Sequence, residues 1–248
     1  MPKTSSKSEK PLVSFVIRTK NEKKLIGKVL KSLQQQTLKN LEIIIIDSGS
    51  TDKTLEIIKK FPIQLIEIKA REYNPSYALN LGINKAKGKY IGIISGHSLP
   101  ISKTCVEDGL VEFKSEKVAA VTGHYTENPI GYFSQRLGRI LFEFEKRKRE
   151  EFCPWLTNTN TIIRKDLWQQ YPFDEKLPEC EDYDWACEML ARGYNIIKEP
   201  KFSVFHSHAF INRPDYYQKA VRARWKRICR LIDKRKRPRQ SFTKIKIK

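Results

Sequence analysis

The stretch Leu41–Asp52, LEIIIIDSGSTD, decides the fold class of this 248-residue chain. Its four consecutive isoleucines are typical of a strand buried on both faces, as in a parallel sheet covered by helices. Asp47 follows at the carboxyl end of the strand, which is the edge where open α/β sheets bind their ligands. The turn after it, which contains Ser50, offers hydroxyl and backbone N–H groups. Such a strand is a weak signal by itself, but a second strand of the same kind upstream, LVSFVIRTKNE, also ends in polar residues, over 18–22. Together the two strand ends predict a nucleotide site.

Strand and helix patterns alternate around this segment. Strands are expected over 12–17, 41–46, 63–68, 90–95 and 118–125, and helices over 22–36, 52–60, 76–87 and 103–114. This βαβα order predicts an α/β fold with a mostly parallel central sheet sandwiched by helices. After Gly131 the pattern changes to a long helical stretch over 133–150, a strand pair near 195–205 and a basic helix from about Pro214. We expect a flexible tail over 1–10, one two-lobed domain over 11–212, and a basic C-terminal helix and tail over 213–248.

The formal net charge of +20 is concentrated near the C-terminus. Residues 213–248 hold 15 Lys and Arg against two Asp, a balance of 15 − 2 = +13. Helical spacing places Trp225, Ile228, Leu231 and Ile232 in an apolar stripe among these cations, as in a helix that lies on an anionic membrane surface. A solvated basic tail is the alternative.

Cysteine use and hydropathy indicate the compartment. The five cysteines are odd in number and form no CxxC pair, which favours reduced thiols and argues against a zinc site. The polar N-terminus lacks the apolar segment of a secretory signal, and no stretch reaches the roughly 18 apolar residues of a membrane span. These features predict a cytoplasmic protein, peripheral at most on the inner face of the membrane.

Six segments together resemble family 2 glycosyltransferases of the GT-A fold. They are VSFVIRTKNE, LEIIIIDSGSTDKT, NPSYALNLGINKAKGKYIGIISGH, NTNTIIRKDLW, PECEDYDW and VFHSH, in that order over roughly residues 11–210. The resemblance implies an inverting, hexosyltransferase-type enzyme. It would move a sugar from a nucleotide diphosphate sugar to a glycan or lipid-linked acceptor in cell-surface polysaccharide synthesis. Residues 11–125 would form the Rossmann-like nucleotide-sugar half and 126–212 the acceptor half.

The resemblance also implies which residues bind the donor, with UDP or dTDP as its nucleotide. These are Thr19, Asn21, Glu22, Asp47, Ser50, Asn80, Ser95, Gly96 and His97. Other roles stay open for three residues of this region. Asp47 could be a turn carboxylate, Asn80 could face solvent, and Arg18 could reach a phosphate or pair with Asp47.

One segment departs from the family pattern. The family usually has Asp-x-Asp after the fourth strand, where two carboxylates bind a divalent metal, but this chain has Ser95-Gly96-His97. An imidazole suits Mn²⁺ better than Mg²⁺. His97 could therefore hold Mn²⁺, donate to a phosphate, or be structural. The resemblance implies a second metal-binding histidine in the VFHSH segment, with His208 the first choice and His206 the second.

The acidic segment PECEDYDW carries the expected catalytic group. An inverting transfer needs one general base to take the proton of the acceptor hydroxyl. Asp182 matches the family's base, and Glu181 would orient it or bind the acceptor. Crowded acids raise each other's pKa values, which suits a base near neutrality. The alternative is that these acids only cap the following helix. Trp185 and Asn160 are assigned to the acceptor, although Trp185 also fits a core position.

Two other classes of function deserve comparison. A nucleotidyltransferase has a related sheet, but its triphosphate-binding loop would be rich in glycine, and RTKNEKK has none. A nucleic-acid-binding protein would spread basic and aromatic residues over one face, whereas here the charge is concentrated after Arg213. We therefore expect no nucleic-acid partner.

Overall fold

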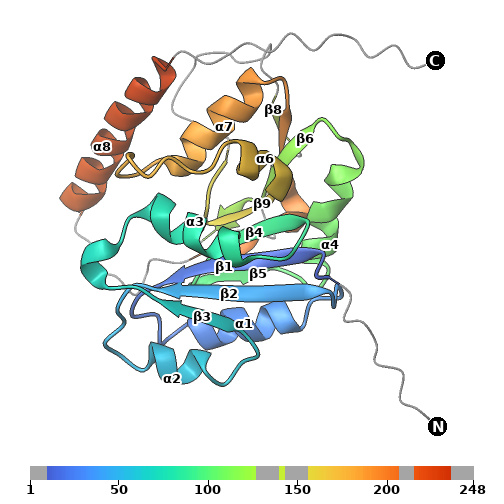
Figure 1. Ribbon diagram of the computed structural model, residues 1–248, viewed down its shortest axis with the longest axis vertical. Coiled ribbons are helices and arrows are strands. Elements are labelled where there is room, and N and C mark those ends of the chain that lie inside the picture. Colours follow the sequence, from blue (N-terminus) through green and yellow to red (C-terminus); the bar gives the residue numbers. More distant parts are fainter. Residues whose placement is uncertain (1–9, 127–139, 143–155, 207–214, 236–248) are drawn as a thin grey trace.

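A computed structural model describes residues 10–126, 140–142, 156–206 and 215–235. In these residues an eight-stranded sheet has the order β3-β2-β1-β4-β9-β6-β10-β8 (Figure 1). The strands are β1 Val13–Thr19, β2 Leu41–Asp47, β3 Gln64–Glu67, β4 Tyr90–Ser95, β6 Val118–Thr122, β8 Ile140–Phe142, β9 Asn160–Arg164 and β10 Asn195–Lys198. Only β8 and β9 pair antiparallel to their neighbours. The predicted α/β fold with a mostly parallel sheet is confirmed.

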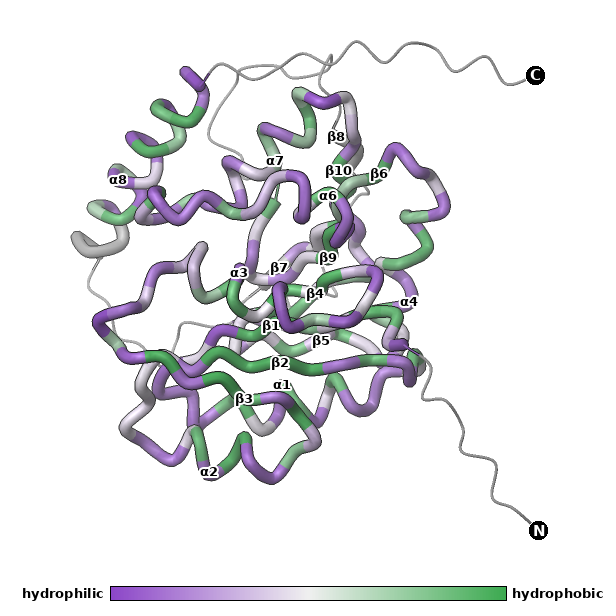
Figure 2. Tube along the Cα trace, viewed as in Figure 1, coloured by the Kyte–Doolittle hydropathy of each residue, from purple (hydrophilic) through white to green (hydrophobic). Residues whose placement is uncertain are grey.

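Helices cover both faces of the sheet (Figure 1). One face packs against α3 (Pro75–Lys85) and α7 (Glu181–Ala191), and the other against α1 (Ile26–Gln34) and α4 (Cys105–Leu110). The shorter helices are α2 (Thr54–Ile58), α6 (Lys165–Gln170) and the 3₁₀ turns Ala70–Glu72, Val111–Lys114 and Pro200–Phe202. The isoleucines of β2 alternate between the two apolar clusters, which explains why the strand is apolar without interruption. Figure 2 shows β2 in green along most of its length.

A small second sheet lies against the first. It has the order β5-β11-β7, formed by Ser98–Pro100, Val204–His206 and Tyr125–Thr126. The two strands predicted near 195–205 are present as β10 and β11, but they do not pair with each other, because β10 joins the large sheet and β11 the small one. The helix predicted over 133–150 is also wrong at 140–142, where β8 pairs with the edge of β10. The rest of that stretch lies outside the described residues.

The basic helix α8 (Asp215–Asp233) packs against α7. Ile228, Cys229 and Ile232 are buried in a cluster with residues of the α7 segment. The predicted apolar stripe is split, because Trp225 and Leu231 are 38% and 61% exposed. No helix in the described residues is long and apolar enough to cross a membrane.

Three ion pairs join α8 and Arg235, two residues beyond its end, to the start of α7 and the segment before it. Arg224 pairs with Glu179 at 2.5 Å. Arg235 pairs with Asp174 at 2.9 Å and with Asp184 at 3.1 Å. The basic helix is thus held by both apolar and ionic contacts.

Candidate active site

The loops after β1 and β2 are joined by hydrogen bonds at the carboxyl edge of the sheet. The backbone N–H of Asn21 donates to Oγ of Ser50 at 2.9 Å, and Oδ1 of Asn21 accepts from the backbone N–H of Thr51 at 2.8 Å. Asn21 has a φ of 57°, a left-handed conformation that asparagine tolerates. The backbone N–H of Glu22 donates to Oγ1 of Thr54 at 2.7 Å. The bonded residues are 29 to 32 positions apart in sequence, so the carboxyl ends of β1 and β2 lie side by side.

Asp47 organises the turn after β2. Its Oδ1 accepts from the backbone N–H groups of Gly49 at 3.0 Å and Ser50 at 2.8 Å, and its Oδ2 accepts from Oγ of Ser50 at 2.6 Å. Gly49 has a φ of 83°, which favours glycine. Asp47 is fully buried, so a contact with a nucleotide would require this turn to open. Arg18 does not pair with Asp47.

The loop after β4 joins the same edge. Nδ1 of His97 bonds to Oε1 of Glu22 at 2.7 Å, and a Cβ on Gly96 would lie 3.4 Å from Oγ1 of Thr19. That hydroxyl is buried and has no hydrogen-bond partner in the described part of the chain. Ser95 is the last residue of β4 and is partly exposed. Thr19, Glu22, Ser95, Gly96 and His97 thus lie together, as their positions at strand ends predict.

His206 packs against His97. Their ring centroids are 4.6 Å apart, and Nδ1 of His206 bonds to Oγ of Ser98 at 2.7 Å. His208, the first choice as a second metal ligand, lies outside the described residues. Within those residues, no group of three or more His, Cys, Asp or Glu side chains is arranged to hold a metal.

The acidic pair stands at the start of α7. Oε1 of Glu181 accepts from Arg18 Nη1 and from Asn158 Nδ2, both at 3.1 Å. Oδ2 of Asp182 accepts from the backbone N–H of Asn158 at 3.0 Å, and Oδ1 from that of Tyr183 at 2.8 Å. Cys180, before the helix, has a φ of 67°. Arg18 and Asn158 therefore tie the acidic pair to the end of β1 and to the loop before β9.

Asp182 has a perturbed protonation equilibrium. Burial and, after it, the negative charge of Glu181 raise its pKa to about 7, although the two backbone donors and Arg18 act in the opposite direction. A carboxylate of this kind is ionised for about half the time at neutral pH, as suits a general base.

Three expected binding residues have structural roles instead. Asn80 is buried, and its amide donates to the carbonyl of Phe173 and to Oε1 of Glu175. Its oxygen accepts from Trp168 Nε1 and from the backbone N–H of Phe173. These bonds use all its hydrogen-bonding capacity, so it is removed from the candidate site, and the alternative that it faces solvent is also wrong.

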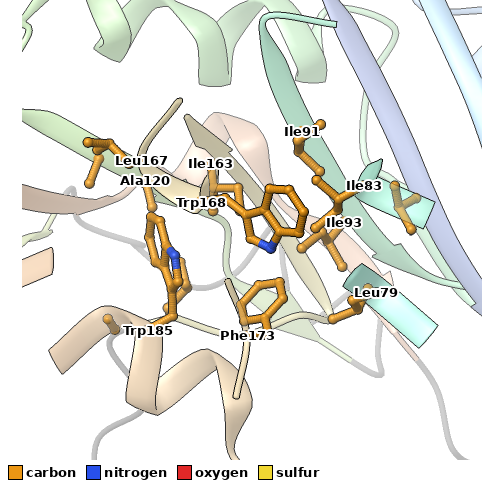
Figure 3. Packing of buried hydrophobic residues seen from close by; sticks show 14 of the residues in the cluster. Leu79, Ile83, Ile91, Ile93, Ala120, Ile163, Leu167, Trp168, Phe173 and Trp185 are labelled. Atoms are coloured by element: carbon orange, nitrogen blue, oxygen red, sulfur yellow. The ribbon is translucent and has the colours of Figure 1, made fainter. Parts of the chain in front are cut away.

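The two acceptor assignments are corrected for the same reason. Trp185 is fully buried and packs with Phe173 at 6.5 Å between ring centroids (Figure 3). It cannot stack on a sugar without unfolding this core. Asn160 is 1% exposed and donates to the carbonyl of Phe202 at 2.6 Å, which joins β9 to the 3₁₀ turn before β11.

The sequence did not single out Asn158, and it left the partner of Arg18 undecided. Asn158 lies in the repetitive segment TNTNT, in which its position differs little from that of Asn160. Only its place in the fold, in the loop before β9 and beside α7, makes Asn158 a hydrogen-bond donor to Glu181 and Asp182.

Comparison with known proteins agrees with this geometry. The sequence model of Glycosyl transferase family 2 matches residues 14–171. An uncharacterized glycosyltransferase of Methanocaldococcus jannaschii is 30% identical over 77% of this chain and 69% of its own length. A dolichyl N-acetyl-alpha-D-glucosaminyl phosphate 3-beta-D-2,3-diacetamido-2,3-dideoxy-beta-D-glucuronosyltransferase of Methanococcus voltae is 39% identical over 76% and 64%. The O-antigen chain rhamnosyltransferase WbaN of Salmonella anatum is 26% identical over 75% and 62%, so the chain spans less than two thirds of some relatives.

Solved structures have the same fold at low sequence identity. The mannosyltransferase PcManGT of Pyrobaculum calidifontis, in complex with GDP-Man and Mn²⁺, has a TM-score of 0.72 at 18% identity, over 92% of this chain and 66% of its own. S. aureus TarS in complex with UDP-GlcNAc has a TM-score of 0.63 at 18% identity, over 89% and 65%. The chain is therefore a glycosyltransferase of the GT-A fold that belongs to glycosyl transferase family 2.

Proposed function

We propose that this protein transfers a sugar, with inversion, from a nucleotide diphosphate sugar to a hydroxyl of a glycan or lipid-linked acceptor. The observation that carries the proposal is the link between Glu181 at the start of α7 and Arg18 at the end of β1. It ties the candidate base, Asp182, to the sheet edge where the loops after β1, β2 and β4 meet. A donor on those loops would thus be held beside the base.

In the proposed reaction the acceptor oxygen attacks the anomeric carbon opposite the leaving diphosphate. Asp182 takes the hydroxyl proton as the new C–O bond forms and the bond to the diphosphate oxygen breaks. One base and one displacement give inversion. The raised pKa of Asp182 supports this role, because a base works best when its pKa lies near the working pH.

The donor would lie on the joined loops. Thr19, Asn21, Glu22, Ser50, Ser95, Gly96 and His97 remain the proposed contacts, with Asp47 shaping the turn beneath them. The unpartnered hydroxyl of Thr19 supports this assignment, because a buried polar atom without a partner is uncommon. We retain UDP or dTDP as the expected nucleotide; the solved relatives were crystallised with GDP-Man and with UDP-GlcNAc.

The residues at this edge fit a divalent metal bound mainly through the donor. His97 would supply an imidazole, which suits Mn²⁺ better than Mg²⁺. Glu22 holds Nδ1 of that ring, so the metal would be held through Nε2, as in carboxylate–histidine pairs at metal sites. When bound, such a metal supplies positive charge to the departing diphosphate. The Mn²⁺ complex of PcManGT supports the proposal.

The acceptor is proposed to be a glycan or lipid-linked glycan of cell-surface polysaccharide synthesis. The similarity to an O-antigen chain rhamnosyltransferase supports this class. The outward face of α8 supports contact with an anionic membrane. Exposed cations on this face are Lys219, Arg222, Lys226, Arg227 and Arg230, with Lys234 just after the helix, and Leu231 is exposed beside them.

Thermal unfolding of the full chain with single nucleotides tests the donor site. UDP, dTDP, GDP and ATP are each added with Mn²⁺, Mg²⁺ or a chelator. A ligand at about 100 times its dissociation constant stabilises the fold by about 2.7 kcal/mol, which is several degrees for a chain of this length. A shift limited to one nucleoside diphosphate supports the proposal and names the base, whereas no shift with any nucleotide contradicts it.

A further inference from the structure

Arg18 reaches across the molecule because of its position in β1. Side chains alternate along a strand, so Arg18 shares a face with Val16, which packs in the same apolar cluster as residues of α7. Arg18 is the residue after Val16 on that face, at the carboxyl end of the strand, and it lies opposite the first turn of α7. There Nη1 of Arg18 lies 3.1 Å from Oε1 of Glu181.

This ion pair has little contact with water. The side chains of Arg18 and Glu181 are 22% and 6% exposed. A carboxylate so deeply buried needs a neutralising partner, because an unpaired buried charge is costly. Asn158 adds a hydrogen bond to Glu181 but no charge. Arg18 is therefore the cation that compensates the charge of Glu181 at this position.

We propose that Arg18 is a positioning residue for the transfer: it fixes Glu181 and cancels its charge, so that Asp182 can accept the proton of the acceptor. The proposal rests on the proposed role of Asp182 as the base. It gives Arg18 neither a contact with the donor nor a proton-transfer step.

The charged and titratable groups around Asp182 support this role. Glu181 lies beside it, Cys180 precedes it, and Arg18 approaches from β1 with Tyr73 close by. Burial and Glu181 raise the pKa of Asp182, and Arg18 lowers it. Without Arg18 the charge of Glu181 would act on Asp182 uncompensated. The base would then ionise only at higher pH.

The test follows the ionisation of Asp182 without any substrate. The full chain is labelled with ¹³C at the aspartate carboxyls, and the Asp182 signal is assigned by its loss in Asp182→Asn. Its titration midpoint is compared in wild type, Arg18→Met, Arg18→Lys and the double variant Arg18→Met/Glu181→Gln. Arg192→Met is the matched control, because Arg192 pairs with Glu188 on the same helix with 15% and 5% exposure.

We expect Arg18→Met to move the midpoint upwards by about one pH unit, the usual effect of losing one nearby opposite charge. Arg18→Lys should move it less, and the double variant should restore it, because the uncompensated charge is gone. Arg192→Met should leave it unchanged. An unchanged midpoint in a folded Arg18→Met protein overturns the proposal. So does loss of the nucleotide-induced thermal shift with the midpoint unmoved, since Arg18 would then contact the donor.

Kinetics separate this proposal from the proposed function. In Arg18→Met the acidic limb of the kcat profile should move to higher pH with the Asp182 midpoint, while the donor KM changes little. If the midpoint moves but Asp182→Asn retains full turnover, the role of Asp182 as base fails although Arg18 still controls its ionisation. In that case Arg18 is not a positioning residue for the transfer.

Discussion

The backbone N–H of Asn158 donates a hydrogen bond to Oδ2 of Asp182 over 3.0 Å. A backbone N–H cannot rotate out of position as a side-chain donor can. The loop before β9 therefore fixes the direction of this carboxylate. The bond favours the ionised form, yet burial and Glu181 outweigh it and leave the pKa at about 7. Asp182 is thus rigidly held but easily protonated, which leads to three predictions.

Replacing Asp182 with Asn should abolish transfer without loss of nucleotide binding. An amide cannot take the acceptor proton, and loss of a general base typically costs about 10² to 10⁴ in rate. The measurements are turnover with the donor found by the nucleotide screen and the nucleotide-induced thermal shift. Asp166→Asn, an exposed carboxylate paired with Arg164, serves as the control and should be fully active. Turnover retained in Asp182→Asn would remove Asp182 as the base.

The rate of transfer should increase with pH through about 7. Asp182 is the base only when it is ionised, and its raised pKa places that ionisation near neutrality. The measurement is kcat from pH 5 to 9 at saturating donor and acceptor. An acidic limb near the ordinary aspartate value of about 4 would show that another group, or an unperturbed Asp182, controls the rate.

The same pKa predicts a gain in stability from Asp182→Asn above neutral pH. A carboxyl whose pKa is raised on folding binds its proton more strongly in the native state, so wild-type stability falls as pH rises from about 4 to about 7. The asparagine side chain does not titrate. We expect the variant to be more stable at pH 8 by about 1 to 2 kcal/mol, allowing for partial exposure of this side chain.

Thermal unfolding at pH 4.5 and at pH 8 measures this effect. The difference in Tm between Asp182→Asn and wild type should be several degrees at pH 8 and much smaller at pH 4.5. An equal difference at both values would indicate that hydrogen bonding, not ionisation, separates the two proteins.

The sequence alone could predict that the carboxyl ends of β1, β2 and β4 lie at one edge of the sheet, because this depends on local patterns. A buried strand has a continuous apolar run, and its polar ending identifies the carboxyl edge, so the positions of Thr19, Ser50 and His97 follow from topology alone. Their contacts then arise between strands that the structure shows to be adjacent, in the order β2-β1-β4.

The roles of Asn80 and Arg18 could not be predicted in this way. Each depends on a partner far along the chain: Asn80 bonds to Phe173, 93 residues away, and Arg18 to Glu181, 163 residues away. Polar and aromatic residues look alike in sequence whether a fold buries them or exposes them. The strand β8 likewise depends on the open edge of β10, which overrides local preference.

His97→Ala should weaken nucleotide diphosphate binding chiefly when Mn²⁺ is present. Nδ1 of the ring is held by Oε1 of Glu22 at 2.7 Å, so a metal would be held through Nε2. The measurement is the nucleotide-induced thermal shift with Mn²⁺ and with a chelator, in wild type, His97→Ala and Glu22→Gln. Both variants should lose the part of the shift that depends on the metal. An equal loss under chelation would instead favour a direct bond from His97 to phosphate.

Replacing Lys219, Lys226 and Arg230 together with Gln should weaken binding to vesicles that contain anionic lipid. These cations are exposed on the outward face of α8, and each contributes about 1 kcal/mol near an anionic surface. The triple variant should therefore bind about 100-fold less tightly in a vesicle sedimentation assay at low salt, and neutral vesicles should bind neither protein.

Arg224→Gln is the matched control for this variant, because Arg224 lies on the same helix but pairs with Glu179 at 2.5 Å. A cation already neutralised by a carboxylate adds little to the attraction of a membrane, so this variant should bind nearly as tightly as wild type. If Arg224→Gln and the triple variant lose the same affinity per charge removed, the net charge of the chain drives binding. The outward face of α8 would then not be the docking surface.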